Sequence, residues 1–335
     1  MTSPLPVTLL MRASKERGFS IEAVFDTIVA HLPKDISPTL AMSPYPSVGV
    51  LPRIMAIIHA WRTTRKAAVI HMTGDAHFLT LLLPRKRTVL TVHDCEFLDR
   101  SRGLKRFILW LIWIRLPGQK AAAITTVSEA GKAQLLRWLK IDPAQVEVIE
   151  NPLSKVMPRV EKPFAAKPRL LMIGTAPHKN VDRVAEAVAG LPVVLEVIGR
   201  LPEDRLARLR QYVEVISRHD LTDAELAAAY AEADILVFPS LSEGFGLPIL
   251  EAQAVGRPVI TSNRSPMSDV AGDAALTVNP EDRAAIRAAV EQLITDAPLR
   301  ARLVEAGFEN VTRFTPQRAA EAYAAIYRRV AQEAK

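Results

Sequence analysis

The spacing of apolar and polar positions along the chain predicts two successive α/β units. Short continuous apolar runs are typical of strands buried on both faces of a parallel sheet, and the segments between them have the apolar rhythm of covering helices. We expect strands at 6–11, 36–42, 67–71, 87–92, 121–127, 145–149, 169–173, 193–198, 213–217, 235–238 and 258–261. The expected helices include 19–31, 50–65, 181–189, 284–294, 298–307 and 317–334.

A proline-bearing stretch at 150–167 has little periodicity and indicates a linker between the two halves. The chain of 335 residues is long enough for two domains. We therefore expect an N-terminal α/β domain at 1–160, a C-terminal α/β domain at 161–315 and a last helix at 316–335.

The segment PSLSEGFGLPILE is the most informative part of the chain. It follows an expected strand, and Gly244 and Gly246 let the backbone turn before a helix begins. Such a turn presents backbone amides and the positive end of a helix dipole at the carboxyl edge of a sheet, where phosphate binds well. Glu243 and Glu251 frame the turn, and a carboxylate beside a phosphate site suits ribose hydroxyls.

The longer segment SEGFGLPILEAQAVGRPVITSN resembles the glutamate, seven residues, glutamate signature of the retaining family-4 glycosyltransferases, which have the GT-B fold. The resemblance implies two Rossmann-like, doubly wound α/β domains facing each other across a cleft. It implies that 1–160 is the acceptor-side domain, that 161–315 binds the nucleotide sugar, and that the last helix, 316–335, packs back toward the N-terminal domain. It also implies that Glu243 positions or polarises the donor sugar and that Glu251 holds the ribose. The other donor-binding residues that it implies are Gly244, Phe245, Gly246 and Leu247. An ordinary strand, turn and helix with two surface glutamates is the alternative.

The segment GTAPHKN opens the second half after its first strand. Gly174 and Thr175 permit a tight turn, and Lys179 puts a cation at the start of the next helix, where a diphosphate would bind. The segment resembles the diphosphate-binding loop of the family, with Lys179 as the lysine that holds the donor. Many relatives have an arginine where Thr175 stands, and His178 or Arg12 could compensate for it. A solvated lysine at a helix start is the alternative.

In the first half, His93 follows an expected strand and so lies at the carboxyl edge of a sheet, where a histidine can exchange a proton. TVHD resembles the strand-end histidine that family-4 enzymes place beside the transferred sugar. A buried, hydrogen-bonded histidine is the alternative. Gly18 is implied to approach the donor diphosphate, but this chain has one glycine where many relatives have a pair, and a plain turn is as good an interpretation.

Other polar residues follow strands at the same expected edge. Asp75 and His77 follow the strand at 67–71, and Asp94 follows His93. We consider Asp75, His77 and Asp94 candidates for binding the acceptor. The alternative is that Asp75 or Thr73 caps the next helix.

The segment LKRFILWLIWIRLP at 104–117 is strongly apolar and has basic neighbours. Its apolar run is too short to span a bilayer, which needs about 20 residues. We expect one of two roles. The region 100–120 lies on an anionic membrane surface, or the segment is a fully buried helix between domains.

The charge balance predicts attraction to anions, since 43 Lys and Arg residues exceed 36 Asp and Glu residues and give a net charge of +7. The sequence has no basic–aromatic pattern of a nucleic-acid binder. The absence of GxGxxG and Walker A motifs disfavours dinucleotide oxidoreductases and P-loop phosphotransferases. No metal-ligand spacing is evident, so we expect no metal and no cofactor. The single cysteine, Cys95, fits a reducing compartment.

Together with these features, the resemblance to the family-4 enzymes implies a retaining, metal-independent glycosyltransferase. Its donor would be a UDP- or GDP-linked sugar and its acceptor a saccharide or lipid-linked saccharide, in surface polysaccharide synthesis. We expect it in the cytoplasm, either free or in peripheral contact with the inner face of the membrane. A nucleotide-sugar epimerase of related fold and a non-catalytic nucleotide-sugar-binding protein are the alternatives.

Overall fold

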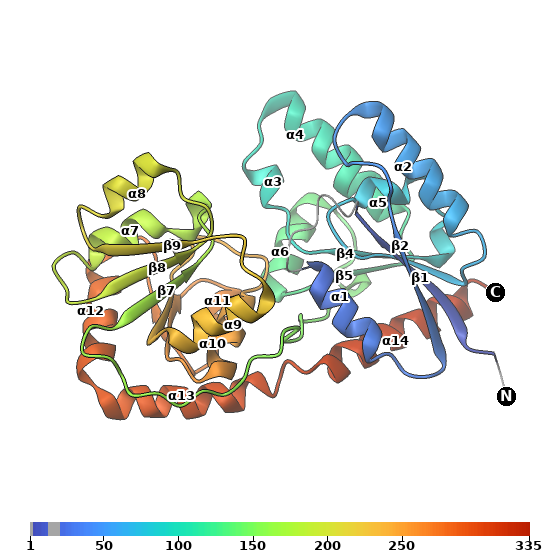
Figure 1. Cartoon of the computed structure of the whole chain (residues 1–335). Coiled ribbons are helices and arrows are strands. Elements are labelled where there is room, and N and C mark those ends of the chain that lie inside the picture. Colours follow the sequence, from blue (N-terminus) through green and yellow to red (C-terminus); the bar gives the residue numbers. More distant parts are fainter. Residues whose placement is uncertain (1–2, 13–20) are drawn as a thin grey trace. The chain divides into compact units, whose positions relative to one another are not determined.

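The computed structural model describes residues 3–12 and 21–335. The chain divides into two compact units, and each contains a six-stranded parallel sheet (Figure 1). Unit 1 comprises Met1–Ser154 and Thr315–Lys335, and unit 2 comprises Lys155–Phe314. The two α/β units expected from the apolar runs are confirmed.

The sheet of unit 1 has the strand order β2-β1-β3-β4-β5-β6, and all its pairs are parallel. The strands are β1 (Leu5–Met11), β2 (Ile36–Met42), β3 (Val69–Met72), β4 (Thr88–Val92), β5 (Ala123–Thr126) and β6 (Val146–Val148). The helices are α1 (Ile21–Ala30), α2 (Val50–Thr63), α3 (Glu96–Asp99), α4 (Gly103–Leu109), α5 (Leu116–Gln119), α6 (Glu129–Trp138) and α14 (Pro316–Glu333). Shorter turns are η2 (His77–Leu82), η3 (Arg85–Arg87), the π-helical η4 (Trp110–Arg115) and η5 (Pro143–Gln145).

Helix α14 belongs to unit 1 although it ends the chain. Its side chains Tyr323 and Tyr327 are fully buried, and Tyr327 Oη lies 2.7 Å from Nδ1 of His71 on β3. Burial lowers the pKa of His71 to about 3, so this histidine is neutral and works as a hydrogen-bonding core residue. Arg328 adds a bidentate ion pair to Asp35 at the surface, at 2.7 and 2.8 Å.

The sheet of unit 2 has the order β12-β11-β10-β7-β8-β9, again with parallel pairs. The strands are β7 (Arg169–Ile173), β8 (Val194–Ile198), β9 (Glu214–Arg218), β10 (Ile235–Phe238), β11 (Val259–Ser262) and β12 (Leu276–Val278). The helices are α7 (Val181–Ala187), α8 (Glu203–Leu209), α9 (Asp223–Glu232), α10 (Leu247–Val255), α11 (Met267–Ala271), α12 (Arg283–Thr295) and α13 (Ala297–Val311), with a short turn η6 (Pro177–Lys179).

Several local signals explain why these elements start and stop where they do. Ser128 caps α6 by accepting a hydrogen bond from the Gly131 amide at 3.0 Å, and Thr222 and Glu225 form a capping box at the start of α9. Gly256 ends α10 in the left-handed conformation, with φ of 87°. The short elements α8, α11 and β12 were not expected, because each is too short to show a period of its own.

The apolar segment at 104–117 forms α4, η4 and the start of α5. Only Ile114 of its apolar run is fully buried, while Phe107 and Ile108 are exposed, so the prediction of a fully buried helix is wrong. Within the described residues, we find no helix with the length and hydropathy needed to cross a membrane.

Candidate functional site

Unit 2 brings the two predicted donor-binding loops together at the carboxyl edge of its sheet. One loop follows β7 and the other follows β10, and these strands are neighbours in the sheet. Lys179 from the first loop donates to Oε1 of Glu243 in the second at 2.7 Å. Both side chains are largely shielded from solvent, with 18% and 12% of their surface exposed. The sequence predicted both residues but not that they pair.

Backbone contacts hold the two loops in register. The Leu241 amide donates to the His178 carbonyl at 2.8 Å. Asn180, in the left-handed conformation with φ of 66°, donates from Nδ2 to the carbonyls of Pro239 at 3.0 Å and Pro280 at 2.6 Å. Asparagine tolerates this conformation better than most residues, because its short amide bonds locally. Asn180 is therefore a site-building residue that the sequence analysis did not identify.

Gly174 makes room for the Lys179 side chain. Its φ is 92°, and a Cβ at this position would lie 2.9 Å from Cε of Lys179 and 3.1 Å from its Cγ. The ammonium lies 4.9 Å from the centre of the Phe238 ring, within cation–π range. A glycine suits this position for two reasons: its φ is positive, and a Cβ would clash with the aliphatic part of the Lys179 side chain.

Thr175, the position where many relatives have an arginine, is held by an arginine from elsewhere in unit 2. Arg205 of α8 donates from Nη1 to the Thr175 carbonyl at 2.5 Å. It also pairs with Asp182, from Nη2 at 2.5 Å and from Nε at 3.0 Å. Because Asp182 neutralises much of its charge, Arg205 mainly fixes the loop. Arg12, considered as a substitute, lies in unit 1 and pairs with Glu22 at 2.7 Å and with Asp75 at 3.2 Å.

The loop after β10 turns into α10 as predicted. Gly246 is the N-cap with φ of 126°, and Pro248 lies in the first turn. A glycine has no side chain with which to cap a helix, so the first amides of α10 point toward the loop side. The Phe245 ring packs inward against Phe314, with ring centres 5.8 Å apart, so only its backbone is available for a donor contact. Gly244 and Leu247 are half-buried beside it.

Glu251 is buried in α10 and bonded to a tyrosine. Tyr230 of α9 donates to its Oε2 at 2.6 Å. Burial raises the pKa of the Glu251 carboxyl above its ordinary value of 4.5, although the Tyr230 hydrogen bond and the charge of Lys155 lower it in part. Lys155 also forms an ion pair with Asp223 at 3.0 Å. Tyr230 is a second partner that the sequence analysis missed.

The raised pKa of Glu251 gives a stability prediction. A carboxyl whose pKa is higher in the folded than in the unfolded chain favours folding when protonated, so its contribution is present below pH 4.5 and is lost as pH rises through the folded pKa. Glu251→Gln keeps an acceptor for Tyr230 and removes the buried charge. At neutral pH we expect its free energy of unfolding to exceed that of the wild type by on the order of 1 kcal/mol, and its melting temperature to be higher.

Thermal unfolding from acid to neutral pH checks this expectation. The extra stability of Glu251→Gln over the wild type should vanish at low pH. Tyr230→Phe removes the hydroxyl that donates to the carboxylate, so this variant should be less stable than the wild type at neutral pH. A Glu251→Gln variant that is less stable than the wild type at neutral pH would contradict the assignment.

Unit 1 places its predicted residues at the carboxyl edges of β3 and β4. His93 is nearly buried, and its Nε2 donates to the Thr73 carbonyl at 2.8 Å. In the neutral ring this bond puts the proton on Nε2 and leaves Nδ1 as an acceptor. The structure thus shows His93 as a buried histidine whose Nε2 is hydrogen-bonded. Its catalytic role stays a prediction.

The acceptor-side candidates differ in accessibility. Asp75 is exposed and pairs with Arg12 at 3.2 Å, and Asp94 is half-buried, with a pKa raised by burial. His77 is buried, and Nδ1 donates to the Trp113 carbonyl at 2.9 Å. Burial lowers its pKa, and Nε2 has no partner among the described residues.

The capping alternative for this region is wrong. Ala76 is the N-cap of η2, no side chain bonds at that cap within the described chain, and Thr73 donates instead to the Leu10 carbonyl at 2.9 Å. Gly18 lies outside the residues that the structure describes, so its predicted role is not addressed.

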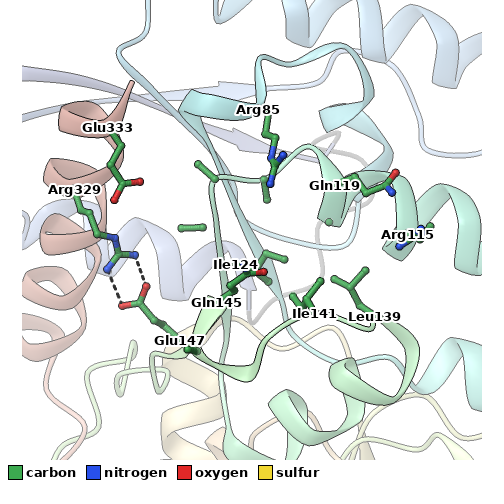
Figure 2. Close-up of a pocket in the computed structure, with 15 residues that line it drawn as sticks. Arg85, Arg115, Gln119, Ile124, Leu139, Ile141, Gln145, Glu147, Arg329 and Glu333 are labelled. Atoms are coloured by element: carbon green, nitrogen blue, oxygen red, sulfur yellow. Dashed lines mark hydrogen bonds and ion pairs between the residues drawn. The ribbon is translucent and has the colours of Figure 1, made fainter. Parts of the chain in front are cut away.

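Unit 1 also contains a pocket of about 840 Å³ that includes none of the predicted site residues (Figure 2). It is lined by Ala122 and Ala123 at the start of β5 and by Gln145 and Glu147 around the start of β6. These positions are the amino edge of the parallel sheet, opposite to the edge at which open α/β sheets bind ligands. Glu147 is paired with Arg329 there. We do not assign the pocket to the reaction.

Among the residues that the structure describes, no group of three His, Cys, Asp or Glu side chains gathers as metal ligands would. Cys95 is buried, and burial raises the pKa of its thiol to about 12. At the carboxyl edge of unit 2, Lys179 is the cation that links the two loops through Glu243.

Comparisons with known proteins agree with this geometry. Residues 7–154 match the family described as Glycosyltransferase Family 4, and residues 156–310 match Glycosyl transferases group 1. O-antigen chain mannosyltransferase B of Escherichia coli is 31% identical over 276 residues, which cover 71% of this chain and 70% of the relative. O-antigen chain mannosyltransferase RfbU of Salmonella typhimurium is 27% identical over 227 residues, covering 64% of this chain and 62% of the relative. The chain belongs to the group 1, family 4 glycosyltransferases.

Solved structures resemble the whole fold. HepE of Anabaena, in complex with UDP and glucose, superposes with a TM-score of 0.76 at 14% identity, covering 97% of this chain and 100% of that one. A glycosyltransferase of Rickettsia africae gives a TM-score of 0.71 at 16% identity, with coverage of 98% and 99%. The predicted GT-B fold class is confirmed.

Proposed function

We propose that the chain is a retaining hexosyltransferase that moves mannose from a nucleotide-sugar donor to a saccharide or lipid-linked saccharide, in the synthesis of a surface polysaccharide. The observation that carries the proposal is the Lys179–Glu243 pair of 2.7 Å between the two loops at the sheet edge of unit 2. The names of the O-antigen mannosyltransferases favour mannose, and a GDP- or UDP-linked donor is consistent with the helix N-terminus and lysine.

As the nucleoside diphosphate departs, negative charge builds up on it. Fixed positive groups stabilise this charge most strongly in the transition state. Lys179 and the first amides of α10 supply such groups, and Glu251 would accept from the ribose hydroxyls. The bond from the anomeric carbon to the diphosphate oxygen breaks while the acceptor oxygen bonds to the same face. The acceptor proton passes to the departing diphosphate. Glu243 would orient the sugar, and His93 would assist near it.

We propose that transfer needs no metal, because Lys179 and the helix dipole already face the departing diphosphate. Asp75, His77 and Asp94 remain candidates on the acceptor side. A nucleotide-sugar epimerase and a non-catalytic binding protein would use the same loops, so only the product distinguishes them.

The test is incubation of the protein with GDP-mannose or UDP-hexoses and a lipid-linked saccharide acceptor, with and without chelator. We expect a transferred sugar whose anomeric configuration by NMR matches that of the donor, at an unchanged rate with chelator. An inverted product would refute retention, and loss of activity with chelator would refute metal independence. Release of an epimerised nucleotide sugar would favour the epimerase, and binding without turnover would favour the non-catalytic protein.

Arg205 gives a prediction about the loop that it holds. Arg205→Met keeps the aliphatic stem but removes the bonds to Asp182 and to the Thr175 carbonyl. Because the loop then loses its anchor, we expect the donor KM to rise about tenfold with a smaller change in kcat. Hydrogen exchange of the amides around 174–180 should also become faster.

Arg208→Met is the matched control, since Arg208 lies on the same helix and pairs with Asp204 at an exposed site. Equal effects of the two variants would show that Arg205 contributes only to the helix and not to the loop.

A further inference from the structure

We propose that one face of unit 1, formed by α2 and α4, docks on an anionic lipid bilayer. The α2–α4 face consists of Val50, Leu51, Ile54, Met55, Ile58 and Trp61 of α2 and of Leu104, Phe107 and Ile108 of α4. The inference does not depend on which sugar the protein transfers. It moves the expected membrane contact from the region 100–120 as a whole to α2 and the first turns of α4.

Helix α2 exposes most of its large apolar side chains to solvent, whereas an ordinary surface helix turns such side chains toward the core. Six of the large apolar side chains of α2 are 37% to 75% exposed, whereas the helix buries the small Ala56 and Ala60 and half-buries Ile57 against the core. At 3.6 residues per turn the exposed apolar positions fall within an arc of about 140°. A continuous apolar stripe of this kind is uncommon on a protein surface that only meets water, and it indicates an interaction surface.

Helix α4 extends the same kind of surface. Leu104, Phe107 and Ile108 have the i, i+3, i+4 spacing of one helix face and are 44% to 73% exposed. The residues that follow turn inward. Trp110 donates from its indole to the Trp138 carbonyl at 2.9 Å, and Trp113 donates to the Asp75 carbonyl at 2.8 Å.

The two helices are connected through their packing. The turn η2 contacts both α2 and η4, which continues α4. The Arg53 guanidinium of α2 lies 4.9 Å from the centre of the Trp113 ring and 5.9 Å from that of Phe78. Figure 1 shows α2 and α4 along the same side of unit 1. Their exposed stripes therefore belong to one region of the surface.

The charges around the α2–α4 face indicate which kind of partner binds it. Residues 36–128 contain thirteen Lys and Arg but only four Asp and Glu, and there is no acidic residue at 36–74 or 100–128. Cations such as Arg62, Lys66, Arg102 and Lys105 border the apolar positions in sequence, and Arg65 stacks on Trp61 at 4.5 Å. An apolar stripe edged by cations and free of anions fits the boundary between acyl chains and anionic headgroups.

The test is partition of the full-length protein into vesicles of phosphatidylcholine with phosphatidylglycerol, compared with phosphatidylcholine alone. We expect binding to the anionic vesicles that weakens as salt rises. The double variant Leu51→Glu with Ile54→Glu should lower this partition by at least about tenfold, because it removes apolar contacts and adds repulsion. Both positions are exposed, so the variant should keep the melting temperature of the wild type.

The matched control is Val156→Glu with Tyr212→Glu, which makes the same charge change at exposed apolar positions of unit 2 and should bind vesicles as the wild type does. Arg102→Ser with Lys105→Ser tests the charge separately and should reduce only the anionic preference. Failure of the wild type to bind anionic vesicles would overturn the proposal, as would full binding by the Leu51→Glu, Ile54→Glu variant. A dimer of the wild type that this variant dissociates, without vesicle binding, would instead assign the face to self-association.

Discussion

Replacing Lys179 with alanine is expected to weaken binding of the nucleoside diphosphate by about 10- to 100-fold and to lower kcat/KM for transfer by about 100-fold or more. The ammonium pairs with Glu243 between the two donor loops and is largely shielded from water, so solvent only weakly screens its attraction for a phosphate that displaces Glu243. The loss in transfer should exceed the loss in binding, because charge on the diphosphate grows as the sugar leaves.

Calorimetric titration and a transfer assay check the two parts separately. The matched control is Lys167→Ala, since Lys167 also pairs with a glutamate, Glu214, at 2.5 Å, but on an exposed part of unit 2. This control should behave as the wild type. Unchanged diphosphate binding in Lys179→Ala would contradict the donor-site assignment.

Replacing Glu243 with glutamine is expected to separate binding from transfer. The Glu243 carboxylate competes with any phosphate for the Lys179 ammonium. Glutamine removes that competing charge, so the nucleoside diphosphate should bind as tightly as before or more tightly. Transfer should nevertheless fall by about 100-fold, because the group proposed to orient the sugar has lost its charge.

The same two measurements apply, with Glu214→Gln as the matched control because Glu214 accepts from Lys167 in the equivalent exposed pair. If Glu243→Gln weakened diphosphate binding as much as Lys179→Ala does, the carboxylate would act by holding the loop together rather than on the sugar.

The sheets were predictable from the sequence because strands buried on both faces leave continuous apolar runs. β2, β7 and β10 have the bounds expected for them. The glycines before α10 likewise predicted the turn at its start. Local signals of this kind depend on near neighbours in the chain, which is why they can be interpreted without a structure.

The partners of the predicted residues could not be predicted in the same way. Tyr230 lies on a helix whose sequence gives no reason to expect a buried hydroxyl aimed at Glu251. Arg205 comes from a short helix that has no clear period, and it meets Thr175 only because β7 and β8 are adjacent. Such contacts are set by the order of strands in the sheet.

The direction in which the apolar face of α2 points also could not be predicted from the sequence. The rhythm at 50–65 predicted a helix, and an apolar stripe normally faces the core. In the structure the alanines and Ile57 face inward, and the other large apolar side chains face outward. Periodicity gives the width of a stripe but not its direction, which is decided by the packing of η2 and η4 beside the helix.

The central claim is that the carboxyl edge of unit 2 binds the nucleotide of a sugar donor. The most direct test is calorimetric titration of the purified protein with UDP, GDP, ADP and TDP, repeated with Lys179→Ala and Glu251→Gln. We expect one of these nucleotides to bind the wild type and to lose affinity in both variants, while the melting temperature of unliganded Glu251→Gln does not fall. If none of them binds, or if binding is the same in all three proteins, the loops joined by Lys179 and Glu243 are not the donor site.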